Sequence, residues 1–133
     1  MSAENVETVK RALDAFNRRD VEGLVALTTA DLQWFPAMPG IVAGDSFRGR
    51  EGVEQYFAGL AETWVEYCSI FEEFRDLGDR VLTLGQLEGR GRGSGAAVAA
   101  PQGTVFEFRG GAISAMRTYL DHAEALKAVG LEE

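Results

Sequence analysis

The last twenty-odd residues of the chain constrain its fold more than any other segment. Gly110 and Gly111 predict a tight turn, and residues 113–120 read as a β-strand. The strand pattern stops abruptly at Asp121, and Glu124 follows three positions later, which is the spacing of a capping box at the start of a helix. The chain is therefore expected to end with a strand that follows a turn and leads into a short helix.

Upstream of this ending, hydrophobic periodicity predicts three helices and four further strands. The helices are expected at about residues 3–19, at about 21–27 after an N-cap at Asp20, and at about 50–64. The strands are expected at 31–36, 65–75, 80–93 and 96–109, with a loop at 37–47. The order α-α-β-α-β-β-β-β-α predicts one α+β domain over residues 1–133, in which a curved mixed or antiparallel sheet wraps around three helices and leaves a pocket.

Composition excludes several classes of function. The chain has 133 residues and a formal net charge of −8, and this charge argues against nucleic acid as a partner because phosphate binding needs a concentrated basic face. A single cysteine, Cys68, excludes an internal disulfide and suits a reducing cytoplasm. The N-terminal residues show no signal-peptide pattern, and no segment approaches the ~20 apolar residues that span a bilayer. We therefore expect a cytoplasmic protein with no membrane partner.

The only histidine, His122, limits the available chemistry. A multi-histidine metal site is impossible with one histidine. A carboxylate-only site for magnesium or calcium remains open, but the sequence contains no Asp-x-Asp ligand run, and no metal and no cofactor are expected. His122 and Asp121 could form an acid/base pair. The alternative, a helix cap at Asp121, is favoured by the capping-box spacing.

Glycines at alternate positions mark residues 85–93. Gly89-x-Gly91-x-Gly93 resembles a phosphate-binding loop superficially, but a strand and not a helix is expected to follow it. The favoured interpretation is a bent strand that leads into a hairpin. Its polar face, with Gln86 and Glu88, is then a pocket rim or a dimer surface. Cys68, in the middle of the preceding strand, is expected to be a core thiol.

Large apolar side chains are numerous for one small core. They are Trp34, Phe35, Tyr56, Phe57, Trp64, Phe106, Phe108 and Met116. Core packing explains most of them individually, and together they also suit a cavity for an apolar ligand. The candidate polar residues on neighbouring elements are Gln33, Gln86, Thr104 and Thr118, and none of them is a strong general base.

Four segments resemble the SnoaL-like branch of the NTF2-like (nuclear transport factor 2-like) superfamily. They are residues 47–53 (FRGREGV), 78–81 (GDRV), 89–95 and 117–131, and the resemblance covers nearly the whole chain. It implies a cone-shaped, cystatin-like α+β barrel with a deep pocket, and a homodimer formed through the outer face of the sheet. Because the superfamily includes isomerases, cyclases, hydrolases and binding modules, the resemblance implies a fold and not a reaction.

The residues of catalytic relatives are not present at the matching positions. Where ketosteroid isomerases carry an oxyanion tyrosine, a general-base Asp, a protonated Asp and a second tyrosine, this chain has Ala12, Phe35, Thr104 and Phe57. The groups that stabilise an enolate are therefore absent, and that isomerisation is not expected. Cyclase and epoxide-hydrolase relatives carry an acidic residue near the end of the last strand, where this chain has Thr118, with Asp121 just beyond.

Three functions remain open. The favoured one is a pocket that binds a small hydrophobic molecule, with walls from Gln33, Phe35, Tyr56, Trp64, Gln86, Thr104, Phe106, Met116 and Thr118. The second is a cofactor-independent cyclase, hydrolase, lyase or isomerase for a polyketide-, terpenoid- or steroid-like substrate, with Asp121 or Glu88 as base. The third is a dimerisation module without a pocket.

Overall fold

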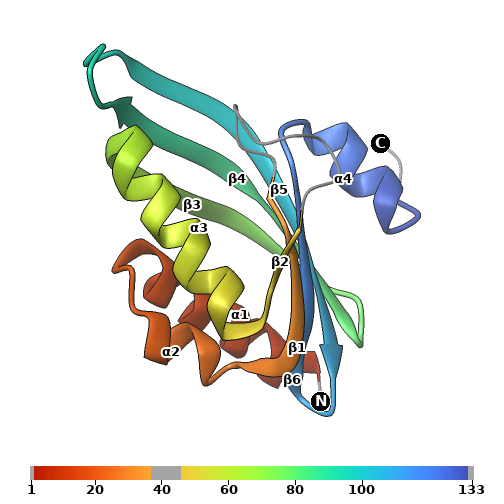
Figure 1. Ribbon diagram of the computed structural model, residues 1–133. Helices are drawn as coiled ribbons and strands as arrows, with labels where there is room; N and C mark the ends of the chain where they lie inside the picture. The colour runs from red at the N-terminus through yellow and green to blue at the C-terminus, as the bar shows by residue number, and fades with distance from the viewer. Residues whose placement is uncertain (1, 37–45, 132–133) are drawn as a thin grey trace.

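The predicted α+β fold, a curved sheet with helices packed in its hollow, is confirmed by the computed structural model (Figure 1). The structure describes residues 2–36 and 46–131. Its helices are α1 (Ser2–Asn17), α2 (Val21–Val25), α3 (Gly49–Thr63) and α4 (His122–Ala128). Its strands are β1 (Thr28–Phe35), β2 (Phe47–Arg48), β3 (Trp64–Asp76), β4 (Arg80–Gly91), β5 (Ala97–Arg109) and β6 (Ala112–Tyr119).

The sheet is mixed, with the strand order β2-β1-β6-β5-β4-β3. Only the β1–β6 pair is parallel among the strand pairs that the structure describes. The expected order lacked one element, β2, because two residues carry no periodic pattern. Phe47 pairs with Trp34 and Arg48 with Gln33, so this short strand forms only when β1 is in place. The rest of the expected loop at 37–47 lies outside the described residues.

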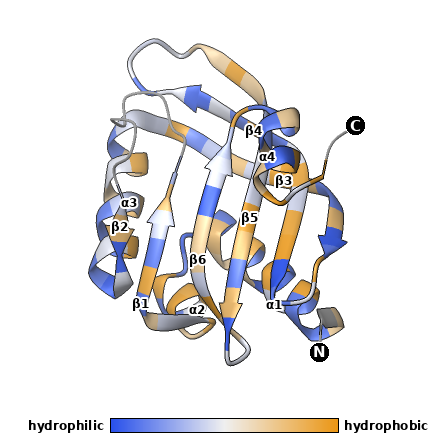
Figure 2. Ribbon diagram, turned by 90° about the vertical axis from the view of Figure 1, so that its right-hand side faces the viewer, coloured by the Kyte–Doolittle hydropathy of each residue, from blue (hydrophilic) through white to orange (hydrophobic). Residues whose placement is uncertain are grey.

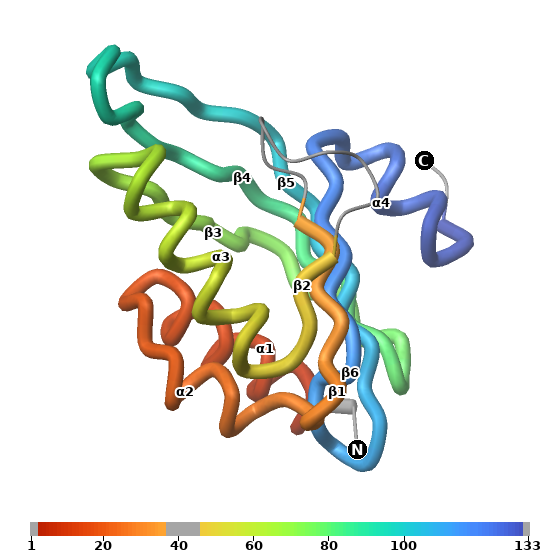
Figure 3. Tube along the Cα trace, in the orientation of Figure 1, coloured from red at the N-terminus to blue at the C-terminus, as the bar shows by residue number. Residues whose placement is uncertain are grey.

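Two layers of helices lie on opposite faces of the sheet (Figures 1 and 3). The helices α1, α2 and α3 fill the concave face, and α4 packs on the convex face. The main core lies on the concave side and includes Val9, Leu32, Val53, Phe106 and Ile113. A second, smaller core lies under α4, where Leu82, Leu84 and Val105 meet Ala125, Leu126 and Val129. No helix of the described residues is both long and apolar enough to cross a membrane.

Strand alternation explains how one sheet supplies both cores. On β4, Val81 and Leu87 belong to the concave core, whereas Leu82 and Leu84 belong to the core under α4. The central strands β4 and β5 are therefore apolar on both faces over part of their length, as the hydropathy colours of Figure 2 indicate for β5. A strand buried on both faces shows no hydrophilic side in its sequence.

The glycine-rich segment forms the predicted hairpin. Gly89 and Gly91 lie in β4, Gly93 and Gly95 have positive φ angles of 93° and 69° in the turn, and β5 follows. A Cβ on Gly89 would lie 2.9 Å from the Trp64 ring, so this glycine allows the indole to pack against the strand. The expectation that a hairpin and not a phosphate-binding loop follows these glycines is confirmed.

Cys68 differs from expectation. It lies on the convex face of β3, between the inward-facing Tyr67 and Ser69, and is only half-buried. The expectation of a core thiol was wrong because the buried face of β3 is carried by its neighbours.

Candidate functional site

A cavity lies between the concave face of the sheet and the helices α1, α2 and α3. It is lined by Ala12, Leu13, Phe16, Leu24, Trp34, Pro36, Tyr56, Tyr67, Ser69, Phe71, Leu87, Gln102, Thr104, Phe106, Met116 and Thr118. Its free space is about 550 Å³ counted out to the mouth, and the centre of a water molecule can reach about 50 Å³ of it. Because the first volume includes open solvent, the second is the measure of the cavity itself, and it is small.

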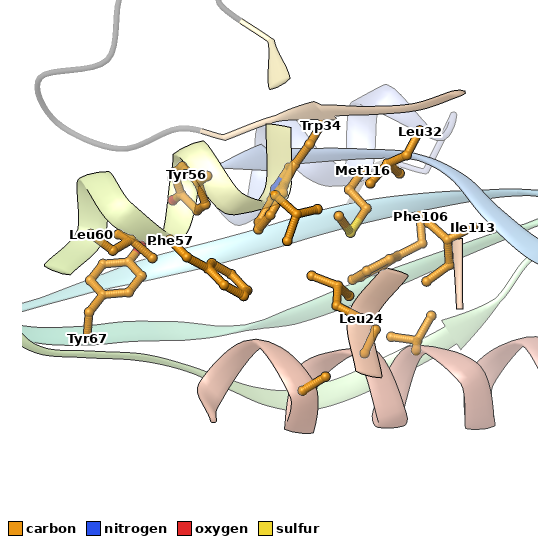
Figure 4. Packing of buried hydrophobic residues seen from close by; sticks show 14 of the residues in the cluster. Leu24, Leu32, Trp34, Tyr56, Phe57, Leu60, Tyr67, Phe106, Ile113 and Met116 are labelled. Atoms are coloured by element: carbon orange, nitrogen blue, oxygen red, sulfur yellow. The ribbon is translucent and has the colours of Figure 1, made fainter. Parts of the chain in front are cut away.

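Aromatic rings form much of the cavity wall. Figure 4 shows three of them, Trp34, Tyr56 and Tyr67, among the packed side chains of the core. Phe16 of α1 is at the centre of this group, with its ring centroid 5.9 Å from Trp34, 6.4 Å from Tyr56 and 6.2 Å from Tyr67. Trp34 and Tyr56 are closer still, at 4.5 Å in an edge-to-face arrangement. These ring contacts make the aromatic side chains a closely packed part of the wall.

Neutral polar side chains from the sheet form a patch in the same cavity. They are Ser69 of β3, Gln102 and Thr104 of β5, and Thr118 of β6. Thr104 and Thr118 are directly opposite each other across β5 and β6, and their hydroxyl oxygens are 3.1 Å apart. The Gln102 side chain is 6% exposed, and its Oε1 has no hydrogen-bond partner among the described residues. This patch can accept and donate hydrogen bonds without carrying a charge.

The two tyrosines of the cavity are neutral hydrogen-bonding groups at ordinary pH. Burial raises the pKa of Tyr67 to about 12, and the hydrogen bond with Tyr56 and the positive charge of the nearby Arg19 act in the opposite direction. Burial also raises the pKa of Tyr56, and interaction with Tyr67 adds to the effect. Both phenols therefore keep their protons, and a hydrogen bond between the two hydroxyls already engages one of these protons.

The end of α1 holds the edge strand β3, which carries Tyr67 and Ser69. The Asn17 side chain donates to the Ser69 carbonyl and accepts from the Ser69 N–H, both at 3.0 Å. Arg19, in a left-handed conformation with φ of 58°, donates to the carbonyls of Phe16 and Tyr67, both at 2.6 Å. Its guanidinium also lies 4.9 Å from the centroid of the Phe16 ring. These contacts satisfy backbone groups on the free edge of the sheet and fix the position of the cavity wall.

The structure brings together five of the nine residues expected in the pocket. Tyr56, Thr104, Phe106, Met116 and Thr118 all line the cavity. The tyrosine comes from α3, and the other four come from the adjacent strands β5 and β6. The two threonines and two apolar residues alternate with outward-facing residues, so the period of two placed them on one face.

The other four expected residues are not in the lining. Gln33 and Phe35 alternate with the buried Leu32 and Trp34 of β1, so they face the convex side, where the Arg117 guanidinium lies 3.9 Å from the centroid of the Phe35 ring. The expectation for this strand was therefore out of phase by one residue.

Gln86 and Trp64 also lie outside the cavity lining. Gln86 alternates with the inward-facing Leu87 and donates to Glu88 at 2.8 Å on the convex side. Trp64 is buried in the concave core at the end of α3, where its ring centroid is 5.4 Å from that of Tyr67. It supports the wall without forming part of it.

The two expected catalytic carboxylates lie away from the cavity. Asp121 is the N-cap of α4 and accepts a hydrogen bond from the Ala123 N–H at 2.8 Å, which confirms the expected helix cap. Glu88 is exposed on the convex face of β4. The Nε2 of His122 lies 2.8 Å from the Gly85 carbonyl oxygen, a contact that ties α4 to β4.

Sequence reasoning missed three cavity residues that carry polar groups: Tyr67, Ser69 and Gln102. The alternation of side chains along β5 could have identified Gln102, because Gln102 shares a face of this strand with Thr104 and Phe106. The same signal was hidden for Tyr67 and Ser69, since the register of β3 shifts between Trp64 and Glu66 and again between Phe71 and Glu73.

The cavity lining contains no Asp, Glu, His, Lys or Arg among the described residues. Nor does the described part of the chain contain a group of three or more His, Cys, Asp or Glu residues that could hold a metal ion. The chemistry of the site is therefore that of neutral hydrogen bonding within an apolar enclosure.

Comparison with known proteins agrees with this architecture. The family model of the SnoaL-like domain matches residues 9–116. This chain belongs to the SnoaL-like family. No match was found among curated proteins.

Solved structures with the same fold cover almost the whole SnoaL-like chain. An NTF2-like protein of unknown function from Burkholderia pseudomallei has 24% identity and a TM-score of 0.79, over 96% of this chain and 98% of its own. The protein TerC, co-crystallised with polyporic acid, has 22% identity and a TM-score of 0.78, over 93% of this chain and 96% of its own. A putative polyketide cyclase from Xanthomonas campestris pv. campestris has 19% identity and a TM-score of 0.73, over 97% and 98% of the two chains. These similarities are similarities of fold.

Proposed function

We propose that this SnoaL-like protein binds a small, uncharged and largely apolar molecule in the cavity between its helices and the concave face of its sheet. The observation that carries the proposal is the composition of the lining: aromatic and aliphatic side chains with one patch of neutral polar groups. Sites for small molecules generally combine an apolar enclosure with a few placed polar groups.

The shape of the cavity supports the same conclusion. The centre of a water molecule reaches about 50 Å³ within an enclosure of mostly apolar side chains, so the concave side is not completely filled. A dimerisation module without a pocket has no need of such a space, which counts against that alternative. TerC, a protein of the same fold, was crystallised with a small organic molecule, and this makes a similar use of the fold reasonable here.

A thermal-shift screen tests the proposal. Steroids, terpenoids and polyketide-like aromatic compounds are added to the protein, and the melting temperature is compared with that in solvent alone. A compound that binds the native state at about 100 times its dissociation constant adds about 2.7 kcal/mol to the free energy of unfolding. We expect at least one neutral aromatic compound to raise the melting temperature by several degrees.

A cavity-filling variant provides the specific control. Ala12 of α1 lines the cavity, whereas Ala58 of α3 is exposed, so Ala12→Leu and Ala58→Leu make the same change inside and outside the site. Ala12→Leu is expected to weaken binding by tenfold or more, and Ala58→Leu is expected to leave it unchanged. Equal binding by both variants, or no stabilisation by any compound, contradicts the proposal.

A catalytic role for the same cavity is the second candidate. The feature that favours it is the pair Tyr56 and Tyr67, whose protonated hydroxyls lie near the positive charge of Arg19. Such donors can stabilise negative charge that develops on a carbonyl oxygen. No general base accompanies them among the described lining residues, so catalysis would consist of orienting and polarising a bound carbonyl compound. Mass spectrometry of a bound compound after incubation, with and without the protein, distinguishes turnover from binding alone.

A further inference from the structure

Gln102 carries a polar atom that has no hydrogen-bond partner among the described residues. Its side chain lines the cavity, is 6% exposed, and places Oε1 where no described residue donates a hydrogen bond to it. A buried carbonyl oxygen without a partner costs about 1–3 kcal/mol of folding free energy. This cost is avoided when a molecule inside the cavity donates a hydrogen bond to Oε1.

The strands beside Gln102 explain why no group of the described residues donates to its Oε1. Its neighbour on β4 is Gly85, which has no side chain, and a Cβ there would lie 1.8 Å from the Ile70 carbonyl oxygen. On the other side, pairing between β5 and β6 ends at Gly103 and Tyr119, so Gln102 has no partner on β6. The amide is therefore flanked by glycine on one side and by the end of a strand on the other.

The nearest polar pair is already engaged. The hydroxyls of Thr104 and Thr118 are 3.1 Å from each other, and the Thr83 hydroxyl donates to the Thr104 carbonyl at 3.3 Å. The Thr104 and Thr118 hydroxyls share one hydrogen bond across β5 and β6, and Thr83 of β4 is bonded to the backbone. Among the described lining residues, Gln102 thus carries a buried acceptor atom without a hydrogen-bond partner, next to a pair of threonine hydroxyls that already contact each other.

The lack of charge in the described cavity lining limits which ligands can bind there. The described lining carries no formal charge, and both cavity tyrosines keep their protons. An ion would lose its hydration without gaining a partner of opposite charge, which is unfavourable in an apolar enclosure. An uncharged molecule with an O–H or N–H group avoids this loss and satisfies Oε1.

We propose that Gln102 selects neutral ligands that carry a hydroxyl or N–H group, by accepting a hydrogen bond from that group at Oε1. This inference rests on the proposed function. It adds that, of two similar apolar molecules, the site binds the one with the hydroxyl or N–H group more tightly. Gln102 acts here as a specificity-determining residue, and the aromatic wall supplies the remaining contact area.

Two probes that differ in one group test the inference. The compound 2-naphthol has a hydroxyl, and 2-methoxynaphthalene has the same ring system with the hydroxyl hydrogen replaced by methyl. We expect the wild-type protein to bind 2-naphthol roughly tenfold more tightly, the ratio given by one hydrogen bond to an otherwise unpaired buried group. Titration calorimetry or competition with a fluorescent probe measures both dissociation constants.

The variants Gln102→Leu and Gln33→Leu make the measurement specific. Gln33 belongs to β1 but faces the convex side, so the same substitution there leaves the cavity untouched. Gln102→Leu is expected to abolish the preference for 2-naphthol while it retains binding of 2-methoxynaphthalene, and Gln33→Leu is expected to keep the wild-type ratio. Gln102→Leu should also raise the melting temperature of the ligand-free protein, because it removes an unpaired buried carbonyl.

The outcomes separate this inference from the proposed function. If the wild-type protein binds both naphthalenes equally, or if Gln102→Leu keeps the preference, the role of Gln102 is wrong although the cavity still binds ligands. If neither naphthalene nor any compound of the wider screen binds, the proposed function itself fails. Should Gln102→Leu not fold, Gln102→Met makes the same test with a more flexible side chain.

Discussion

Tyr67 serves two purposes at the scale of a single residue. Its phenol lines the cavity, and its backbone carbonyl accepts a hydrogen bond from Arg19 at 2.6 Å. The first role needs a protonated hydroxyl in an apolar setting. Folding therefore favours the neutral phenol and raises its pKa to about 12 from the model-compound value of 10.0.

This shift predicts how stability changes in alkali. Because the pKa is raised in the folded state, the contribution of Tyr67 is fully present below pH 10, where the phenol of the unfolded chain is protonated, and it is lost as the pH rises from 10 to about 12. A difference of two pKa units corresponds to about 2–3 kcal/mol. Tyr67→Phe is therefore expected to lose less unfolding free energy than the wild-type protein over this range, as measured by urea denaturation at a series of pH values.

The wild-type protein and Tyr67→Phe at pH 7 provide the reference for this comparison, since both side chains are then uncharged. Parallel loss of stability by the two proteins between pH 10 and 12 would show that the Tyr67 phenol ionises as readily in the fold as in the unfolded chain.

At the scale of elements, the contact between α1 and β3 decides the shape of one cavity wall. The strand β3 lies at the edge of the sheet, and an edge strand has backbone groups without strand partners. Asn17 satisfies both groups of Ser69 in the manner of a neighbouring strand. Arg19 adds a third contact two residues away. Residues at the C-terminal end of α1 thus make the hydrogen bonds to β3 that a further neighbouring strand would make.

Asn17→Ala is expected to destabilise the protein by about 1–3 kcal/mol, because two part-buried backbone groups lose their partner. The neighbouring Arg18→Ala, which removes an exposed ion pair with Asp14, is the matched control and should change stability little. Chemical denaturation measures both. Hydrogen exchange of the Ser69 amide should increase in the first variant only, and unchanged exchange in Asn17→Ala would contradict the role assigned to this contact.

At the scale of the whole molecule, α4 covers only part of the convex face. The part formed by β3 and the far ends of β4 and β5 remains open, and it includes Ile70 at 38% exposure and Val65 at 52%. The resemblance to the NTF2-like superfamily implied a homodimer through this face of the sheet. We propose that assembly for this protein, because it would cover apolar side chains that α4 leaves in water.

Sedimentation equilibrium tests the dimer directly. We expect the wild-type protein to sediment with twice the mass of one chain, and Ile70→Asp to sediment with the mass of one chain, since a buried unpaired carboxylate opposes association. Glu62→Lys, on the exposed side of α3, changes charge away from the convex face and is expected to keep the dimer. A wild-type protein with the mass of one chain at all concentrations would refute the assembly.

Much of this architecture was predictable because it depends on local chemistry. The caps at Asp20 and Asp121 follow from short side chains that accept backbone N–H bonds, and the structure has both. The turn at Gly110 and Gly111, where both φ angles are positive, follows from the conformational freedom of glycine. The family resemblance predicted the concave sheet and the helices inside it.

Tertiary structure alone decided which side of each strand became the cavity. The sequence determined that Trp34 and Phe35 face opposite ways, but only the packing of β1 between β2 and β6 turned Trp34 inward and Phe35 outward. Nor could sequence show that Gln102 stands beside a glycine and beyond the end of β6, because that isolation depends on strand register. Alternation is a property of one strand, whereas inside and outside are properties of the assembled sheet.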